Sequence, residues 1–107
     1  MPAQHNTTLL SKLSELTTKY RANDTLTNLG IKMADMKNRM GLPPDMFMNK
    51  LNNLNLDQKL YIAYIYCSEM IEHKRASGAE DKAIDRTRKH NQVIMGRLMN
   101  TGEIGEY

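Results

Sequence analysis

The chain has 107 residues, 40% of them hydrophobic and 25% charged, and a net charge of +3, which are the values of one globular domain with a modest core. Its single cysteine excludes an internal disulfide and favours the reducing cytoplasm. No apolar run could span a bilayer and no basic-then-apolar leader is present, so a membrane or exported protein is not expected.

Two amphipathic helices are expected first. Asn6 or Thr7 can cap the first, whose apolar residues recur at spacings of four, three and four: Leu9, Leu13, Leu16 and Tyr20. Asp24 or Thr25 can cap the second, whose stripe has the same narrow spacing: Leu26, Leu29, Met33, Met36 and Met40. Such stripes form core or dimer surface.

A turn and a short third helix follow. Gly41 can supply a left-handed residue that ends the second helix, and Pro43 and Pro44 suit the first turn of the next. The third helix is expected from Pro43 to about Asn53, with four residues turned to the core: Met46, Phe47, Leu51 and Leu54. The order resembles a helix-turn-helix unit, although an ordinary three-helix corner is favoured on spacing alone. Lys37 also stands where a tight unit usually has a small residue.

The fourth helix is expected to begin at Leu56, capped by Asn55, and it contains eight apolar or aromatic residues in succession from Leu60 to Cys67. A buried strand is the alternative, but Met70 and Ile71 continue a helical pattern. A helix that is apolar all round must be covered all round, so a second subunit is expected on its far face. Five residues are therefore predicted at a dimer interface: Leu60, Tyr61, Tyr64, Ile65 and Cys67. Cys67 is either a buried small hydrophobe or a neighbour of its own copy.

The last helix, about Glu80 to Asn100, is amphipathic and basic. Between His73 and Arg97 there are seven Lys or Arg against three acidic residues, so the rest of the chain is slightly negative. One face is mostly apolar: Ile84, Thr87, Asn91, Ile94 and Leu98. The other predicts contacts to DNA phosphates or base edges through six residues: Lys82, Arg86, Arg88, Lys89, His90 and Arg97. A solvated helix face is the alternative.

No catalytic or metal-binding arrangement is evident. The three histidines, His5, His73 and His90, lie far apart and match no metal-ligand spacing. Cys67 lies in an apolar run, which is the wrong setting for a nucleophilic thiolate. We therefore expect no enzyme activity, no cofactor and no metal site in this chain.

Four short motifs, in order, resemble the FlhD family of bacterial transcriptional activator subunits. That family has an arginine-hydrophobic-glycine turn, an acidic-Met step, a Leu-x-Leu-x-Gln helix start followed by a cysteine, and a final His, Ile-Met, Arg-Leu-Leu-Asn series. The matching residues here are Arg39-Met40-Gly41-Leu42, Asp45-Met46, Leu54-Asn55-Leu56-Asp57-Gln58 with Cys67, and His90, Val93-Ile94-Met95 and Arg97-Leu98-Met99-Asn100. An extra residue between Met46 and Leu56 and a shorter, more charged linker before the last helix mark a divergent relative, of a kind that a mobile element could carry.

The resemblance implies an all-α fold of about five helices, an intertwined homodimer with a helix-turn-helix-like element. It also implies an FlhC-like partner subunit, with which the protein binds promoter DNA and recruits RNA polymerase, and any zinc is expected in that partner. Residues 6–75 would form the dimerisation core, 79–100 the basic helix and 101–107 a loose tail. The alternative is a small helical adaptor or inhibitor that binds a host protein without DNA.

Overall fold

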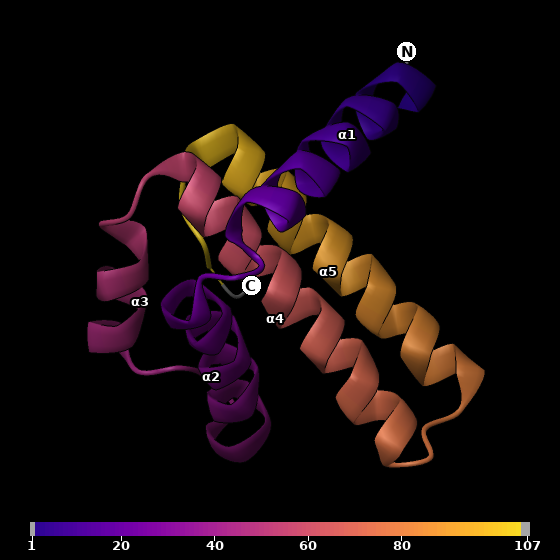
Figure 1. The fold of residues 1–107 in the computed structure, drawn as a ribbon. Coiled ribbons are helices and arrows are strands. Elements are labelled where there is room, and N and C mark those ends of the chain that lie inside the picture. The colour runs from indigo at the N-terminus through magenta and orange to yellow at the C-terminus, as the bar shows by residue number, and fades with distance from the viewer. Residues whose placement is uncertain (1, 106–107) are drawn as a thin grey trace.

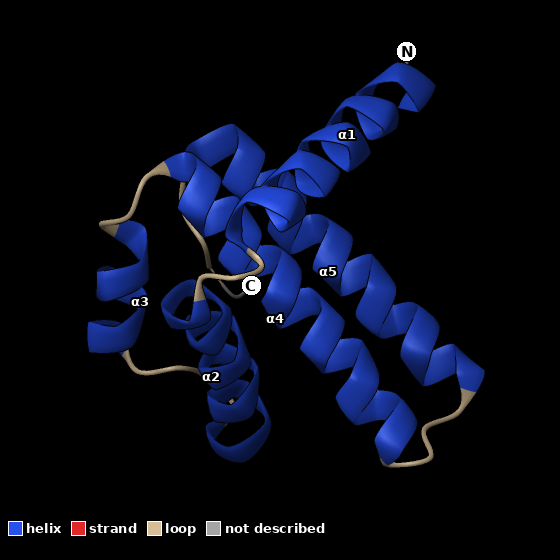
Figure 2. Ribbon diagram, in the orientation of Figure 1, coloured by secondary structure: helices blue, strands red, loops and turns tan. Residues whose placement is uncertain are grey.

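The computed structural model describes residues 2–105, with side chains from residue 9 onward. Five helices and no strand occur in this part of the chain, which confirms the all-α prediction (Figures 1 and 2). The helices are α1 (Pro2–Tyr20), α2 (Asp24–Met40), α3 (Asp45–Asn52), α4 (Leu56–Ala76) and α5 (Asp81–Thr101). The first helix thus begins before the expected caps, Asn6 and Thr7, and the third is shorter than expected at both ends.

Helix α4 is the centre of the fold, and α1, α2 and α5 all pack against it (Figure 1). This explains the uninterrupted apolar run from Leu60 to Cys67, because a helix with neighbours on several sides has little surface left for solvent. Most of the run is buried within this one chain: Leu60, Tyr61, Ile62, Ala63 and Tyr66. The second subunit inferred from this run is therefore not needed to bury these residues.

Helices α2 and α4 approach each other closely at Gly30. Gly30 is buried in the middle of α2, and a Cβ atom built on it would lie 2.6 Å from Cβ of Ile65 and 2.9 Å from the carbonyl oxygen of Ile62. Atoms other than hydrogen do not approach so closely without strain. Gly30 therefore sets how near α2 lies to α4.

Side-chain caps start α2 and α4, and glycines with positive φ follow the ends of α2, α4 and α5: Gly41, Gly78 and Gly102. The N-cap of α2 is Asn23, rather than Asp24 or Thr25, and its side chain accepts a hydrogen bond from the Leu26 amide. At the start of α4 Asn55 and Gln58 form a reciprocal capping box. After α4 the amide of Gly78 donates to Arg75 and that of Ala79 to Lys74, the two bonds of a Schellman motif, which requires the positive φ of 74° at Gly78.

The segment after α5 is packed, which corrects the expectation of a loose tail as far as residue 105. Ile104 is only 2% exposed, and its backbone exchanges two hydrogen bonds with the side chain of Asn52, of 2.8 and 3.1 Å. The buried ammonium of Lys59 donates to the carbonyls of Gly102 and Asn52, at the C-terminal ends of α5 and α3. A cation is favourable there because helix C-termini carry partial negative charge.

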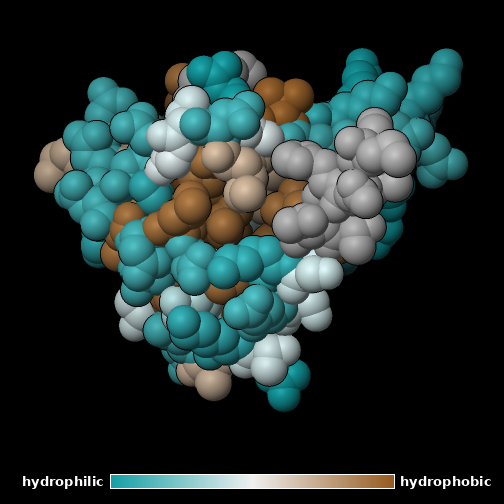
Figure 3. All heavy atoms as spheres, turned by 90° about the horizontal axis from the view of Figure 1, so that it is seen from above, coloured by the Kyte–Doolittle hydropathy of each residue, from teal (hydrophilic) through white to brown (hydrophobic). Residues whose placement is uncertain are grey.

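Some apolar side chains stay at the surface of the single chain. Met46 was expected in the core but is 86% exposed, whereas Leu51 on the same short helix is fully buried. Leu10, Leu42 and Met40 are each more than half exposed. On the face seen from above, hydrophobic side chains come to the surface in a hollow among hydrophilic ones (Figure 3). The molecule thus keeps apolar surface that a partner could cover.

Candidate functional site

Helix α5 carries the predicted DNA-binding residues, and its apolar face fixes how they are presented. Ile94 and Leu98 are buried against the rest of the chain, while Ile84, Thr87 and Asn91 are half-buried. The helix lies beside α4 and runs antiparallel to it (Figure 1). This face was predicted correctly, because residues three and four apart lie on one side of a helix.

The opposite face of α5 is exposed and basic. We call Lys82, Arg86, Lys89 and Arg97 the basic face, and all four are exposed. At 1.5 Å of rise per residue the face extends about 22 Å along the helix. Helix α5 has five Lys or Arg against two Asp, so it holds a charge equal to the net charge of the whole chain. Such a row of cations suits a polyanion.

Arg88 and His90, the two predicted DNA contacts outside the basic face, do not lie together. At 100° per residue their side chains leave the helix about 160° apart, on opposite flanks of the buried face. Arg88 forms an exposed ion pair of 3.5 Å with Asp85, one turn earlier on the same helix. His90 is half-buried and turns toward α2 and α4. The two residues therefore cannot serve one base-reading patch in a single chain.

On the His90 flank, α2, α4 and α5 enclose a groove of about 310 Å³ that we call the basic groove. It is lined by Lys37, Met70, Lys74, Ala83, Arg86, Thr87, His90 and Asn91. Arg86 belongs to both the basic face and this groove. Sequence reasoning missed Lys37 and Lys74 as site residues. Lys74 lay within the basic stretch of the sequence, but no local pattern brings Lys37 of α2 next to α5.

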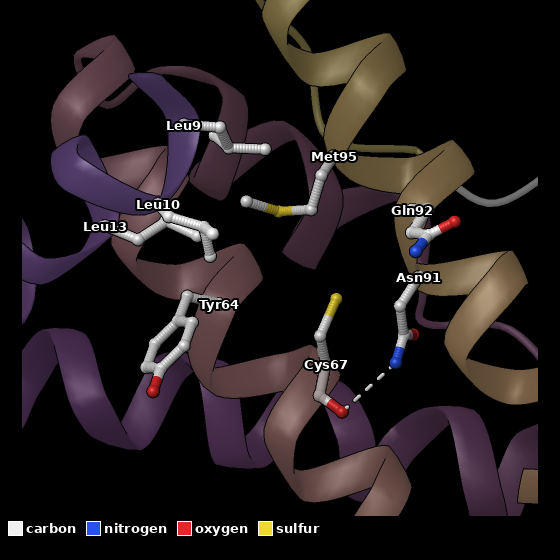
Figure 4. Close-up of a pocket in the computed structure, with 8 residues that line it drawn as sticks. All are labelled: Leu9, Leu10, Leu13, Tyr64, Cys67, Asn91, Gln92 and Met95. Atoms are coloured by element: carbon white, nitrogen blue, oxygen red, sulfur yellow. Dashed lines mark hydrogen bonds between the residues drawn. The ribbon is translucent and has the colours of Figure 1, made fainter. Parts of the chain in front are cut away.

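On the other flank, α1, α4 and α5 enclose an apolar groove of about 450 Å³ (Figure 4). It is lined by Leu9, Leu10, Leu13, Tyr64, Cys67, Asn91, Gln92 and Met95. The close-up shows the leucines of α1 facing Met95 of α5, with the Cys67 sulfur pointing into the space between them (Figure 4). A shallower hollow of about 350 Å³ continues it along α1 past Ser14, Thr17 and Thr18.

Asn91 lines both grooves. Its amide nitrogen donates to the Cys67 carbonyl at 3.3 Å, drawn as a dashed line in Figure 4. Its Oδ1 is the one buried side-chain oxygen without a hydrogen-bond partner among the residues that the structure describes. A buried oxygen without a hydrogen bond costs stability, and here it belongs to a side chain that lines both grooves.

The predicted dimer residues fall into three environments. Leu60 and Tyr61 are 1% and 2% exposed within the single chain, and the Tyr61 hydroxyl forms a 2.7 Å hydrogen bond with Thr27. Ile65 packs against Gly30 in the α2–α4 contact. Tyr64 and Cys67 line the apolar groove. In this conformation only Tyr64 and Cys67 are placed to meet a second subunit.

A turn joins α2 to α3, and whether these helices form the predicted helix-turn-helix-like element stays a prediction. The composition of α3 does not favour DNA binding. This helix has one acidic and one basic residue, Asp45 and Lys50, and its N-cap Pro44 makes no side-chain hydrogen bond. An element that enters a DNA groove usually needs cations and polar groups at its N-terminal end. The row of exposed cations that would suit a polyanion lies on α5 instead.

Among residues 9–105, whose side chains the structure describes, no cluster of three or more His, Cys, Asp or Glu could bind a metal, and His5 lies outside this range. None of the described helices combines the length and apolar character needed to cross a membrane. No protein-family model, no curated protein and no solved structure matches this chain. The resemblance to FlhD therefore rests on the residues quoted for it alone.

Proposed function

We propose that this chain is a DNA-binding subunit of a transcriptional activator of the FlhD type. In this proposal it binds promoter DNA together with an FlhC-like partner, and the complex recruits RNA polymerase. The observation that carries the DNA-binding part is the basic face of α5, where four exposed cations share one side of a helix whose other side is packed. The partner and the polymerase are supported by the motif resemblance.

The basic face supplies affinity more readily than sequence selectivity. Lysine and arginine on an exposed helix face contact phosphates, and phosphate contacts carry no base information. With Arg88 and His90 on opposite flanks, few side chains remain for base edges. Alone, the chain should bind DNA with a Kd of about 10⁻⁴ to 10⁻⁶ M, and a partner should supply the selectivity. A footprint on a defined sequence by the isolated chain at nanomolar concentration would show that the partner is dispensable.

The test compares two double variants that lose the same charge. Lys82→Gln with Lys89→Gln removes two cations from the basic face, and Lys32→Gln with Lys50→Gln removes two exposed cations elsewhere. Binding to a mixed-sequence duplex is measured by fluorescence anisotropy across a salt series. The first pair should lower the slope of log K against log salt by about two and weaken binding roughly sixtyfold at 0.1 M salt. The second pair should change neither.

If both double variants change the salt slope and the affinity equally, the cause is the net charge of the protein and the basic face is only a solvated surface. The second candidate function, a helical adaptor that binds a host protein, would then lead. The apolar groove favours that candidate, because its leucine, tyrosine and methionine lining suits the apolar face of a partner helix.

A further inference from the structure

The basic groove brings cations from three helices to one place. Lys37 comes from α2, Lys74 from α4, and Arg86 and His90 from α5. None of the eight residues that line the groove is acidic. Like charges that converge without an acid destabilise a fold, so this arrangement favours an anion that enters from outside.

Two acids on the helices that supply the groove lysines form ion pairs with other residues. Asp35 pairs with Arg39 at 2.9 Å, and Glu72 pairs with Arg75 at 3.3 Å. Within the described part of the chain, neither Lys74 nor Arg86 has an acidic partner. The charges of Lys74 and Arg86 are therefore not neutralised by ion pairs within the described part of the chain.

The size of the groove and its position beside the basic face of α5 indicate which class of anion it would bind. Its volume of about 310 Å³ equals roughly ten water molecules, which is enough for one phosphate group and several waters. Arg86 connects it to the basic face, which continues along α5 through Lys89 to Arg97. A single free anion in the groove would not contact these further cations, whereas a nucleic-acid backbone presents phosphates in a row that can.

We propose that the basic groove seats one backbone phosphate of a nucleic acid, held by Lys37, Lys74 and Arg86, while the rest of the strand follows the basic face. This rests on the proposed function, since it assigns the nucleic acid bound by α5 a fixed anchoring point. The anchor would join α2 and α4 to the interface, and it would set the direction in which the backbone crosses α5.

The experiment uses the full chain and two glutamine variants of the groove, Lys37→Gln and Lys74→Gln, with Lys32→Gln as the matched control on α2. Lys32 is exposed and lies five residues from Lys37, so its side chain leaves α2 in a different direction. Binding to a mixed-sequence 20-bp duplex is measured across a salt series, and thermal unfolding shows that each variant is folded. Each groove variant should lower the salt slope by about one and the affinity by about eightfold at 0.1 M salt. Lys32→Gln should change neither.

Unchanged slopes for both groove variants would overturn the proposal. If Lys82→Gln and Lys89→Gln still lowered the salt slope in the same assay, the proposed DNA-binding function would stand and only the phosphate anchor would be rejected. If those two variants also left the slope unchanged, the anchor and the proposed function would both be rejected. A second arm titrates inorganic phosphate into the protein and follows the backbone amides of His90 and Asn91 by NMR. Saturation by phosphate as tight as by the duplex would show a site for free anions and would overturn the nucleic-acid assignment.

Discussion

The two flanks of α5 differ in chemistry although one helix forms both. On one side α2 and α4 add lysines to make the basic groove, and on the other α1 and α4 add leucines and a tyrosine to make the apolar groove. Asn91 reaches both, and α5 itself contributes to each. The difference comes from the neighbours of α5 rather than from α5 alone. The proposed binding of DNA and the proposed binding of an apolar partner should therefore be separable by mutations in α1 and α2.

The largest effect is expected where α2 meets α4. Gly30→Ala places a methyl group 2.6 Å from Ile65 and 2.9 Å from a backbone oxygen, so α2 must move. We expect a loss of about 3 kcal/mol of unfolding free energy, at the upper end for overpacking, measured by urea unfolding. Helix α2 lines the basic groove but not the apolar groove. The substitution should therefore lower the proposed affinity for DNA more than the affinity for a partner of the apolar groove.

Gly96→Ala is the control for Gly30→Ala. Gly96 is an exposed glycine inside α5, and nothing lies within 4 Å of an added Cβ. Alanine there should raise stability by roughly 0.5–1 kcal/mol. Equal destabilisation by both substitutions would show that the α2–α4 contact is not the cause. The same contact makes Ile65→Asp a poor probe of dimerisation, since it would disrupt the packing on Gly30.

Leu10→Asp tests the apolar flank and is expected to have the next largest effect. Leu10 is 67% exposed, so the folded monomer should change by less than about 0.5 kcal/mol. The wild-type chain should be a dimer at micromolar concentration. If the apolar groove is its interface, the variant should dissociate about tenfold more readily, equivalent to about 1.4 kcal/mol, by analytical ultracentrifugation.

Ser14→Asp provides a matched charge on the exposed side of α1, at the edge of the shallower hollow. It should weaken association less than Leu10→Asp, because no apolar side chain is lost. A wild-type protein that sediments as a folded monomer would contradict the dimer prediction, and the apolar groove would then be left for a different partner.

Gly78→Ala acts on the turn that orders the ends of α4 and α5. Alanine at a φ of 74° is strained by about 1 kcal/mol, which urea unfolding should detect. The backbone carbonyl of Lys74 accepts a hydrogen bond of this turn, so straining the turn should shift Lys74 in the basic groove. A modest loss of DNA affinity should therefore accompany the loss of stability. Unchanged stability would mean that the chain finds another way to cap α4.

Arg88→Gln should have the smallest effect of the series. Arg88 points away from the basic groove, and its ion pair with Asp85 is exposed, so stability should fall by only about 0.3–0.5 kcal/mol. The DNA salt slope should change less than for Lys89→Gln in the same titration. An equal change would place Arg88 within the DNA interface and would extend that interface to the apolar flank.

Local features of the sequence determined the helices and their faces. Asn55 predicted the start of α4. The three-four spacing that runs from Ile84 through Thr87, Asn91 and Ile94 to Leu98 predicted which side of α5 is packed. Helix caps and amphipathic faces depend on neighbours within one or two turns, so they can be read from a linear sequence. The basic face of α5 is predictable for the same reason, because its cations recur at helical spacing along one segment.

Only the tertiary structure decided what lies beside those faces. Lys37 and Arg86 line the same groove, and Gly30 lets α2 approach α4. No spacing rule within one helix predicts either arrangement. The apolar run of α4 suggested a second subunit, yet other helices of the same chain bury Leu60 and Tyr61. The C-terminal segment is held in place because Ile104 finds Asn52, 52 residues earlier. These outcomes depend on how distant surfaces fit together, which is set by packing across the whole chain rather than by any local pattern.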